Sequence, residues 1–200
     1  MELNVLLSLI AFAWISCFTP GPNNLLLTAS GARFGLRHSV AHIFGVSAGL
    51  MLMLLMMACG IGALFLKWPF LQMILKVGGS FYLLYLAWMI AKSGAPKMTQ
   101  TSNLRPWRFH QATLFQFMNP KAWLMCISAI GSFTAVGEKY WLSVALILMV
   151  FALVGLKTSS VWTIFGVKLS SWLKTPEAWQ RWNWVMAALT VGCIYLIWCE

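Results

Sequence analysis

A group of residues that cannot continue a helix lies inside an otherwise apolar stretch, at Thr19-Pro20-Gly21-Pro22-Asn23-Asn24. Each proline lacks a backbone N–H and clashes with the carbonyl four residues back, so residues 3–30 cannot form one regular helix. The freed N–H groups, and the positive end of a helix that restarts at Pro22, can bind an anion. Asn23 and Asn24 add side-chain donors and acceptors, although both could instead cap the broken backbone. We interpret Pro20, Gly21, Pro22, Asn23 and Asn24 as candidate substrate-binding residues.

A second break of the same kind is predicted at Asn119-Pro120-Lys121, inside the apolar stretch 111–134. Lys121 lies too deep in this stretch to be an end residue, so it either extends to the membrane surface or faces a cavity. Facing inward, its ammonium is a counter-charge for a substrate carboxylate. Gln116 lies three residues before Asn119 and shares its helix face. Gln116, Asn119, Pro120 and Lys121 complete the candidate binding site.

Three further residues are weaker candidates: Lys157, Ser159 and His42. In a helix over 141–160, Lys157 lies near one end and can extend to the membrane surface, or it can face the cavity. His38 and His42 are four residues apart, on one helix face, and no third ligand accompanies them, so we predict no metal site. We interpret both histidines as interfacial residues, with proton transfer as the alternative.

The composition defines the class of protein that holds these residues. Sixty per cent of the residues are hydrophobic, 9% are charged, and the mean hydropathy is +0.79. A helix needs about 20 apolar residues to cross a bilayer. The chain contains six such stretches, at roughly 3–30, 39–66, 69–91, 111–134, 140–164 and 180–199. We predict an all-α membrane protein with six transmembrane helices and no separate soluble domain.

The two halves of the chain resemble each other. Each break lies in the first helix of a three-helix half, and Tyr85-Leu86-Ala87-Trp88 is echoed by Tyr195-Leu196-Ile197-Trp198. Because three is odd, the halves must enter the membrane from opposite sides. The single domain 1–200 is thus predicted to contain an inverted repeat, with repeat one at 1–92, a linker at 93–110 and repeat two at 111–200. Helices one and four, both interrupted at proline, would then meet near the midplane.

The net charge of +10 is distributed unevenly between the predicted connections. Connections one, three and five hold nine basic residues against two in the others: Arg33, Arg37, Lys92, Lys97, Arg105, Arg108, Lys168, Lys174 and Arg181, against Lys67 and Lys139. The positive-inside rule therefore predicts that both termini lie outside the cytoplasm. Anionic membrane lipids, and not nucleic acid, are the expected partners of the basic face.

Close helix packing is predicted where small residues recur four positions apart, at Gly31 and Gly35 and at Gly45 and Gly49. The pair Gly78-Gly79 is expected to act in the same way.

Three of these motifs together resemble the LysE/RhtB family of bacterial amino-acid exporters. They are Thr19-Pro20-Gly21-Pro22-Asn23, Gly45-x3-Gly49 and Asn119-Pro120-Lys121-Ala122. The similarity covers essentially the whole chain, including Val161-Trp162-Thr163-Ile164-Phe165-Gly166. The resemblance implies an inner-membrane transporter, not an enzyme, that exports amino acids or close derivatives by proton motive force. It implies no cofactor and leaves the substrate open.

Two alternatives belong to other classes. A membrane thiol–disulfide electron carrier could use Cys17 and Cys126, which lie near the two breaks. A passive channel or assembly factor is the other alternative. The oligomeric state also stays open, with a homodimer as one option.

Overall fold

The structure of the chain is a computed structural model that describes residues 3–61, 67–92 and 105–199, and every regular element in these ranges is helical. The elements are α1 (Leu3–Phe18), α2 (Pro22–Met56), the π-helical turn η1 (Met57–Ile61), α4 (Pro69–Lys92), α5 (Phe109–Phe117), α6 (Pro120–Phe133), the 3-10 turn η2 (Gly137–Lys139), α7 (Tyr140–Trp172) and α8 (Pro176–Cys199). The predicted all-α class is confirmed for the described residues.

Both predicted helix breaks are present. α1 ends at Phe18 and α2 begins at Pro22, after Gly21 in an extended conformation (φ −163°, ψ 173°). In the second half, α5 ends at Phe117 and α6 begins at Pro120. Proline fits the first turn of a helix because its missing N–H would have no partner there. The same local chemistry therefore ends one helix and starts the next at both sites.

α2 is folded back on itself at Gly35. Gly35 has a positive φ (φ 76°, ψ 171°), and the hydroxyls of Ser30 and Ser39 lie 2.9 Å apart across it. A continuous helix would separate residues nine positions apart by about 13.5 Å. The predicted packing role of Gly35 is wrong, because a Cβ there would meet no other atom of the described residues within 4 Å, apart from the adjoining chain. Gly35 instead turns the chain between helical segments 22–34 and 36–56.

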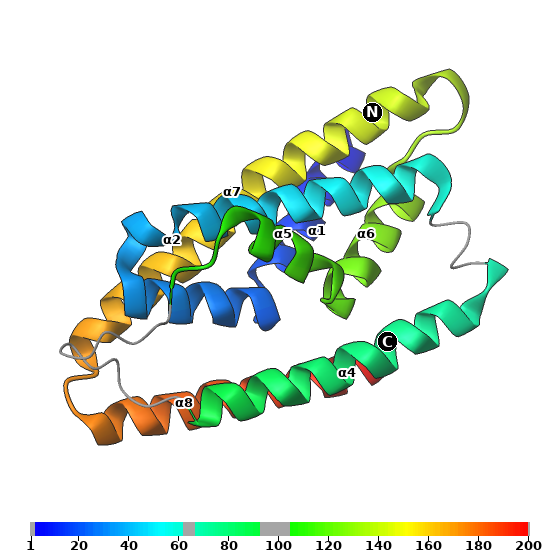
Figure 1. Cartoon of the computed structure of the whole chain (residues 1–200). Helices are drawn as coiled ribbons and strands as arrows, with labels where there is room; N and C mark the ends of the chain where they lie inside the picture. Colours follow the sequence, from blue (N-terminus) through cyan, green and yellow to red (C-terminus); the bar gives the residue numbers. More distant parts are fainter. Residues whose placement is uncertain (1–2, 62–66, 93–104, 200) are drawn as a thin grey trace.

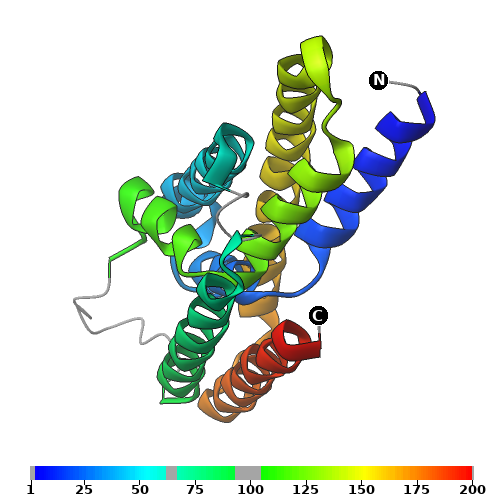
Figure 2. The same ribbon diagram turned by 90° about the vertical axis from the view of Figure 1, so that its right-hand side faces the viewer.

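The helices form two groups (Figure 1). α7 lies against α2, with α1 and α6 beside it, while α4 and α8 pack along each other as a pair. The view turned by 90° shows this pair below the larger group (Figure 2), and Leu83 of α4 packs with Phe115 of α5 where the two groups meet. The main apolar core joins α1, α2, α6 and α7, with fully buried side chains at Leu9, Met53, Cys126, Ile147 and Phe151.

Gly45 and Gly49 confirm their predicted packing role. A Cβ at Gly45 would lie 2.4 Å from the carbonyl oxygen of Phe109, and one at Gly49 would lie 2.7 Å from that of Thr113. These two glycines thus form the surface of α2 on which α5 lies. The same prediction is wrong for Gly78, because a Cβ there would meet no other described element within 4 Å.

Two described stretches, Pro22–Ile61 and Gly137–Trp172, are long and apolar enough to cross a membrane, and α1 is a shorter apolar helix. Because α2 folds at Gly35, the first stretch comprises two helices and not one long span. Six spanning helices and the inverted repeat therefore stay predictions.

Several predicted boundaries are wrong. The fifth apolar helix continues to Trp172 instead of ending near 164, the sixth begins at Pro176, and α5 begins at Phe109, inside the predicted linker 93–110. Residues 62–66 of the second stretch, residues 93–104 of the linker, and the terminal Glu2 and Glu200 lie outside the described residues.

Candidate functional site

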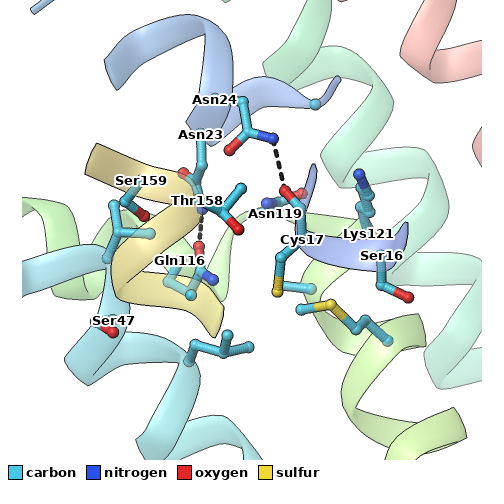
Figure 3. A pocket seen from close by; sticks show the side chains of 16 residues that line it. Ser16, Cys17, Asn23, Asn24, Ser47, Gln116, Asn119, Lys121, Thr158 and Ser159 are labelled. Carbon is cyan, nitrogen blue, oxygen red and sulfur yellow. Dashed lines mark hydrogen bonds between the residues drawn. The ribbon is translucent and has the colours of Figure 1, made fainter. Parts of the chain in front are cut away.

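The two helix breaks meet and are joined by side chains from each half of the chain (Figure 3). The ammonium of Lys121, in the first turn of α6, donates a hydrogen bond of 2.6 Å to the carbonyl oxygen of Thr19. The amide of Asn23, in the first turn of α2, donates a hydrogen bond to the side-chain oxygen of Gln116. Residues about one hundred positions apart in sequence thereby become one site.

The first break is shaped for this contact. A Cβ on Gly21 would lie 3.2 Å from the Cδ atom of Lys121, so a larger residue would press against the lysine stem. Asn24 donates hydrogen bonds to the carbonyl oxygens of Cys17 (2.9 Å) and Thr19 (3.0 Å). It therefore caps carbonyls at the end of α1, which is the capping alternative predicted for this residue.

A cavity lies where the breaks meet. It leaves about 50 Å³ for the centres of water-sized molecules, which is room for a few waters. Its walls come from the end of α1, the first break with the start of α2, the middle of α2, the second break with the start of α6, and the middle of α7. The lining residues are Ser16, Cys17, Gly21, Asn23, Asn24, Val46, Ser47, Leu50, Gln116, Asn119, Lys121, Ala122, Met125, Gly155, Thr158 and Ser159.

Two buried oxygens in this cavity have no hydrogen-bond partner in the described part of the chain. They are the side-chain oxygens of Asn23 and Asn119, whose residues are only 6% exposed. Among the described residues that line the cavity, Lys121 is the one charged residue and none carries a carboxylate. The site therefore combines a fixed positive charge with two uncharged acceptors.

Most of the predicted site residues line this cavity, and some do not. Gly21, Asn23, Asn24, Gln116, Asn119, Lys121 and Ser159 do so, whereas Pro20, Pro22 and Pro120 shape the breaks without lining it. Sequence reasoning missed the hydroxyls of Ser16, Ser47 and Thr158. Their signal was a small polar residue inside an apolar helix, with Ser47 lying between the packing glycines 45 and 49.

Comparison with known proteins decides the class of this protein. Residues 14–198 match the LysE type translocator family. The chain belongs to this family. As a LysE type translocator it is a membrane transporter and not an enzyme.

Two relatives of this LysE type translocator are named as cysteine/O-acetylserine efflux proteins. The one from Klebsiella pneumoniae is 32% identical over 187 residues, 92% of each chain. The one from Escherichia coli is 27% identical over 182 residues, 91% of each chain. No solved structure gives a significant match.

Lys157 is outside the cavity of this LysE type translocator. It lies in the middle of α7, because that helix runs to Trp172, and its side chain is exposed. It lines a shallow apolar surface groove together with Trp14, Ile43 and Val161. The prediction of Lys157 near a helix end is therefore wrong, and its alternative placement in the cavity is wrong as well. Its neighbours Thr158 and Ser159, on another face of α7, do line the cavity.

His42 is fully buried and does not line the cavity, so its candidacy as a binding residue is wrong. His38, one turn earlier, is exposed. The interfacial position of both histidines stays a prediction.

The two cysteines of the redox alternative have different surroundings. Cys17 is partly buried and lines the cavity, whereas Cys126 is fully buried in the apolar core. Both are free thiols. Membership of the LysE type translocator family favours transport over the redox alternative.

Proposed function

We propose that this protein exports a small amino acid or a close derivative across the bacterial inner membrane, and that the cavity between the two breaks is its substrate site. The observation that carries the proposal is the pairing of a fixed cation, Lys121, with the unpaired oxygens of Asn23 and Asn119. An amino acid needs this pair of features, because it carries a carboxylate and an ammonium on one carbon.

The carboxylate is expected at Lys121. The ammonium of Lys121 lies between the two breaks, where helical segments 22–34 and α6 both begin. The first turn of a helix carries partial positive charge and unpaired N–H groups. Interrupted helices that bring their N-terminal ends to an anionic group are a recurring feature of transporter sites.

The substrate ammonium is expected at the oxygens of Asn23 and Asn119. An ammonium donates three hydrogen bonds, and both oxygens are buried acceptors without a partner in the described part of the chain. Because Lys121 already balances the charge of the substrate carboxylate, uncharged acceptors suit a zwitterionic substrate. A carboxylate in their place would suit a substrate with an additional positive charge.

The size of the cavity favours small substrates. About 50 Å³ for water-sized centres is room for a few heavy atoms, less than a whole amino acid, so the cavity must widen to bind substrate and a small side chain requires the least widening. Val46, Leu50, Ala122 and Met125 form the apolar part of the wall. The relatives are named for efflux of cysteine and O-acetylserine, which are small amino acids, and we propose the same class here.

The proposed transport cycle is alternating access. The discontinuous helix formed by α1 and segment 22–34 is matched in the second half by α5 and α6. We propose that these are equivalent parts of an inverted repeat in a six-helix bundle, with both termini outside. The two halves would rock around the cavity and expose it to each side in turn. Proton motive force is the proposed energy source.

Export of labelled amino acids from loaded cells tests the proposal. Cells that produce the protein should lose labelled cysteine or O-acetylserine faster than cells with an empty vector, and a protonophore should abolish the difference. Unchanged pools of all twenty amino acids, O-acetylserine and homoserine, with the protein well inserted, would overturn the assignment.

Two controls separate the alternatives. Export that persists after the protonophore would indicate a passive channel. The double variant Cys17→Ser and Cys126→Ser should still export, whereas an electron carrier would be inactive without both thiols.

A further inference from the structure

His42 is a buried titratable residue that the proposed binding site does not use. Its side chain is 0% exposed, and neither ring nitrogen has a hydrogen-bond partner in the part of the chain that the structure describes. Its ring stacks on that of Trp107, with centroids 5.3 Å apart and planes 17° from parallel. Buried polar groups are nearly always paired, so an imidazole with no partner among the described residues requires an explanation.

Trp107 covers His42 on the side of a surface groove. The groove is lined by Arg105, Trp107, Gln111, Leu114, Phe115 and Met118. Trp107 also packs edge-on against Phe115 of α5, with ring centroids 5.3 Å apart. An outward movement of Trp107 would therefore open His42 to water in this groove.

His42 is also close to the substrate cavity along the chain. Val46 and Ser47, about one helical turn further along α2, line that cavity. On the neighbouring helix, α5, Gln116 follows Phe115 directly and binds Asn23. α5 thus carries both Phe115, which packs against Trp107, and Gln116, which lines the substrate cavity.

The charged and titratable groups on the surrounding elements do not pair with His42. They are Arg33, Arg37 and His38 on α2, Arg105, Arg108 and His110 before and on α5, Lys76 and Lys92 on α4, Lys157 and Lys168 on α7, and Glu177 and Arg181 on α8. In the described residues none of them donates to or accepts from the imidazole. Three other titratable groups lie elsewhere: Cys17 and Lys121 line the substrate cavity, and Glu138 lies in the turn η2.

We propose that His42 is the residue that binds the coupling proton, with Trp107 as its cover; this rests on the proposed export function. Imidazole is the side chain that ordinarily changes charge near neutral pH, and His42 is the buried histidine of the described residues. In each cycle one proton from the outside binds a ring nitrogen of His42 and forms an imidazolium. The same proton later leaves to cytoplasmic water, and no other bond changes.

The stack with Trp107 links the proton to movement of the cover. A cation is attracted to the face of an indole ring more strongly than a neutral ring is. Protonation of His42 is therefore expected to hold Trp107 in place and keep the groove side closed. When Trp107 moves outward, water in the groove can take the proton from His42. The neutral imidazole then no longer holds the ring, so Trp107, α5 and Gln116 can move and substrate can enter from the cytoplasm.

Reconstituted protein tests this proposal with labelled cysteine, kept reduced, as the probe. The variant His42→Gln removes the titration and keeps a polar side chain. We expect it to exchange internal for external cysteine at the wild-type rate but to lose accumulation driven by a pH gradient. His38→Gln, one turn earlier and exposed, is the matched control and should retain both activities.

Each other outcome has a defined meaning. Gradient-driven accumulation by His42→Gln at the wild-type level overturns the role of His42, and so does a wild-type protein that exchanges cysteine but ignores the gradient. A wild-type protein that exchanges no amino acid overturns the export function itself. If His42→Gln loses both exchange and gradient-driven accumulation, His42 has a structural role and the proposal is overturned.

A second variant covers the case in which His42→Gln does not fold. Trp107→Leu removes the aromatic face but keeps an apolar side chain over the imidazole, so protonated His42 loses its attraction to the ring without being opened to water. Proton release on binding of cysteine can be followed with a pH indicator in detergent. The pH at which this release is half-maximal should be lower in Trp107→Leu than in the wild type. An unchanged midpoint, or no released proton in the wild type between about pH 5 and 8, overturns the proposal.

Discussion

Gly31 of α2 and Gly166 of α7 bring two helix backbones into direct contact. A Cβ on Gly31 would lie 2.0 Å from the carbonyl oxygen of Thr163, and a Cβ on Gly166 would lie 2.0 Å from that of Thr28. The hydroxyl of Thr28 also donates to the carbonyl oxygen of Trp162 at 3.3 Å. The restarted half of the first discontinuous helix is held against α7 at this crossing. Since α7 carries Thr158 and Ser159, this contact sets one wall of the cavity.

Alanine at either glycine is expected to destabilise the protein. The obstructing atoms belong to the backbone, so the helices must separate, and overpacking of this kind costs about 1–3 kcal/mol or more. Gly31→Ala and Gly166→Ala should lower the thermal unfolding temperature in detergent. Gly131→Ala is the control, because a Cβ there would meet no other described element within 4 Å. Equal unfolding temperatures for all three variants would contradict the close contact.

Lys121→Met should leave the protein inserted but weaken export of cysteine at least about tenfold, or ~1.4 kcal/mol of substrate interaction. The substitution removes the charge that we assign to the substrate carboxylate and the bond to Thr19. The measurement is the concentration dependence of exchange in proteoliposomes. Lys157→Met is the matched control and should behave like the wild type, because Lys157 faces away from the cavity. Normal rate and affinity in Lys121→Met would make the lysine an anchor between the breaks.

Asn119→Leu should weaken binding of an amino acid by roughly tenfold or more, because a hydrogen bond to a charged group contributes about 1.5–3 kcal/mol. The side chain of Asn119 makes no capping bond, so its loss should leave α6 intact. Competition by propionate, which lacks the ammonium, should be the same in the variant and the wild type. If Asn119→Leu weakens binding of the amino acid and of propionate equally, Asn119 shapes the cavity and does not recognise the ammonium.

Met125→Ala is expected to broaden the substrate range. Met125 forms part of the apolar wall, and its truncation enlarges a cavity that is otherwise suited to small side chains. Leucine and methionine should then compete with labelled cysteine in exchange assays, which they should not do in the wild type. Ala122→Leu fills the same wall and should abolish exchange of every amino acid. Competition by leucine in the wild type would refute the size limit.

Reporter fusions test the proposed orientation. A fusion at Thr175, between α7 and α8, should report the cytoplasm, and one at Glu200 should report the outside, because the basic residues gather in connections one, three and five. A fusion at Ser102, in the predicted linker, should also report the cytoplasm. A cytoplasmic C-terminus would contradict either the six-helix arrangement or its orientation.

The sequence by itself determined where the two helices break and that the described chain is helical. Both are local properties: proline lacks an N–H wherever it lies, and long apolar stretches can satisfy their backbone inside a membrane only as helices or as closed barrels. It also selected seven of the sixteen cavity-lining residues, and six of these sit at or beside the breaks. The packing surface at Gly45 and Gly49 was equally visible, since their spacing places both glycines on one helix face.

Only the tertiary structure decided which side chains meet. The fold-back at Gly35 depends on a single backbone conformation, and glycine in a sequence permits that conformation without requiring it. The length of α7 placed Lys157 in mid-helix and turned it away from the cavity, while Thr158 turned toward it. Burial of His42 required Trp107 to return from a distant segment. Helix rotation and long-range packing set these contacts, because a local motif records neither the partner of a helix nor the face that it presents.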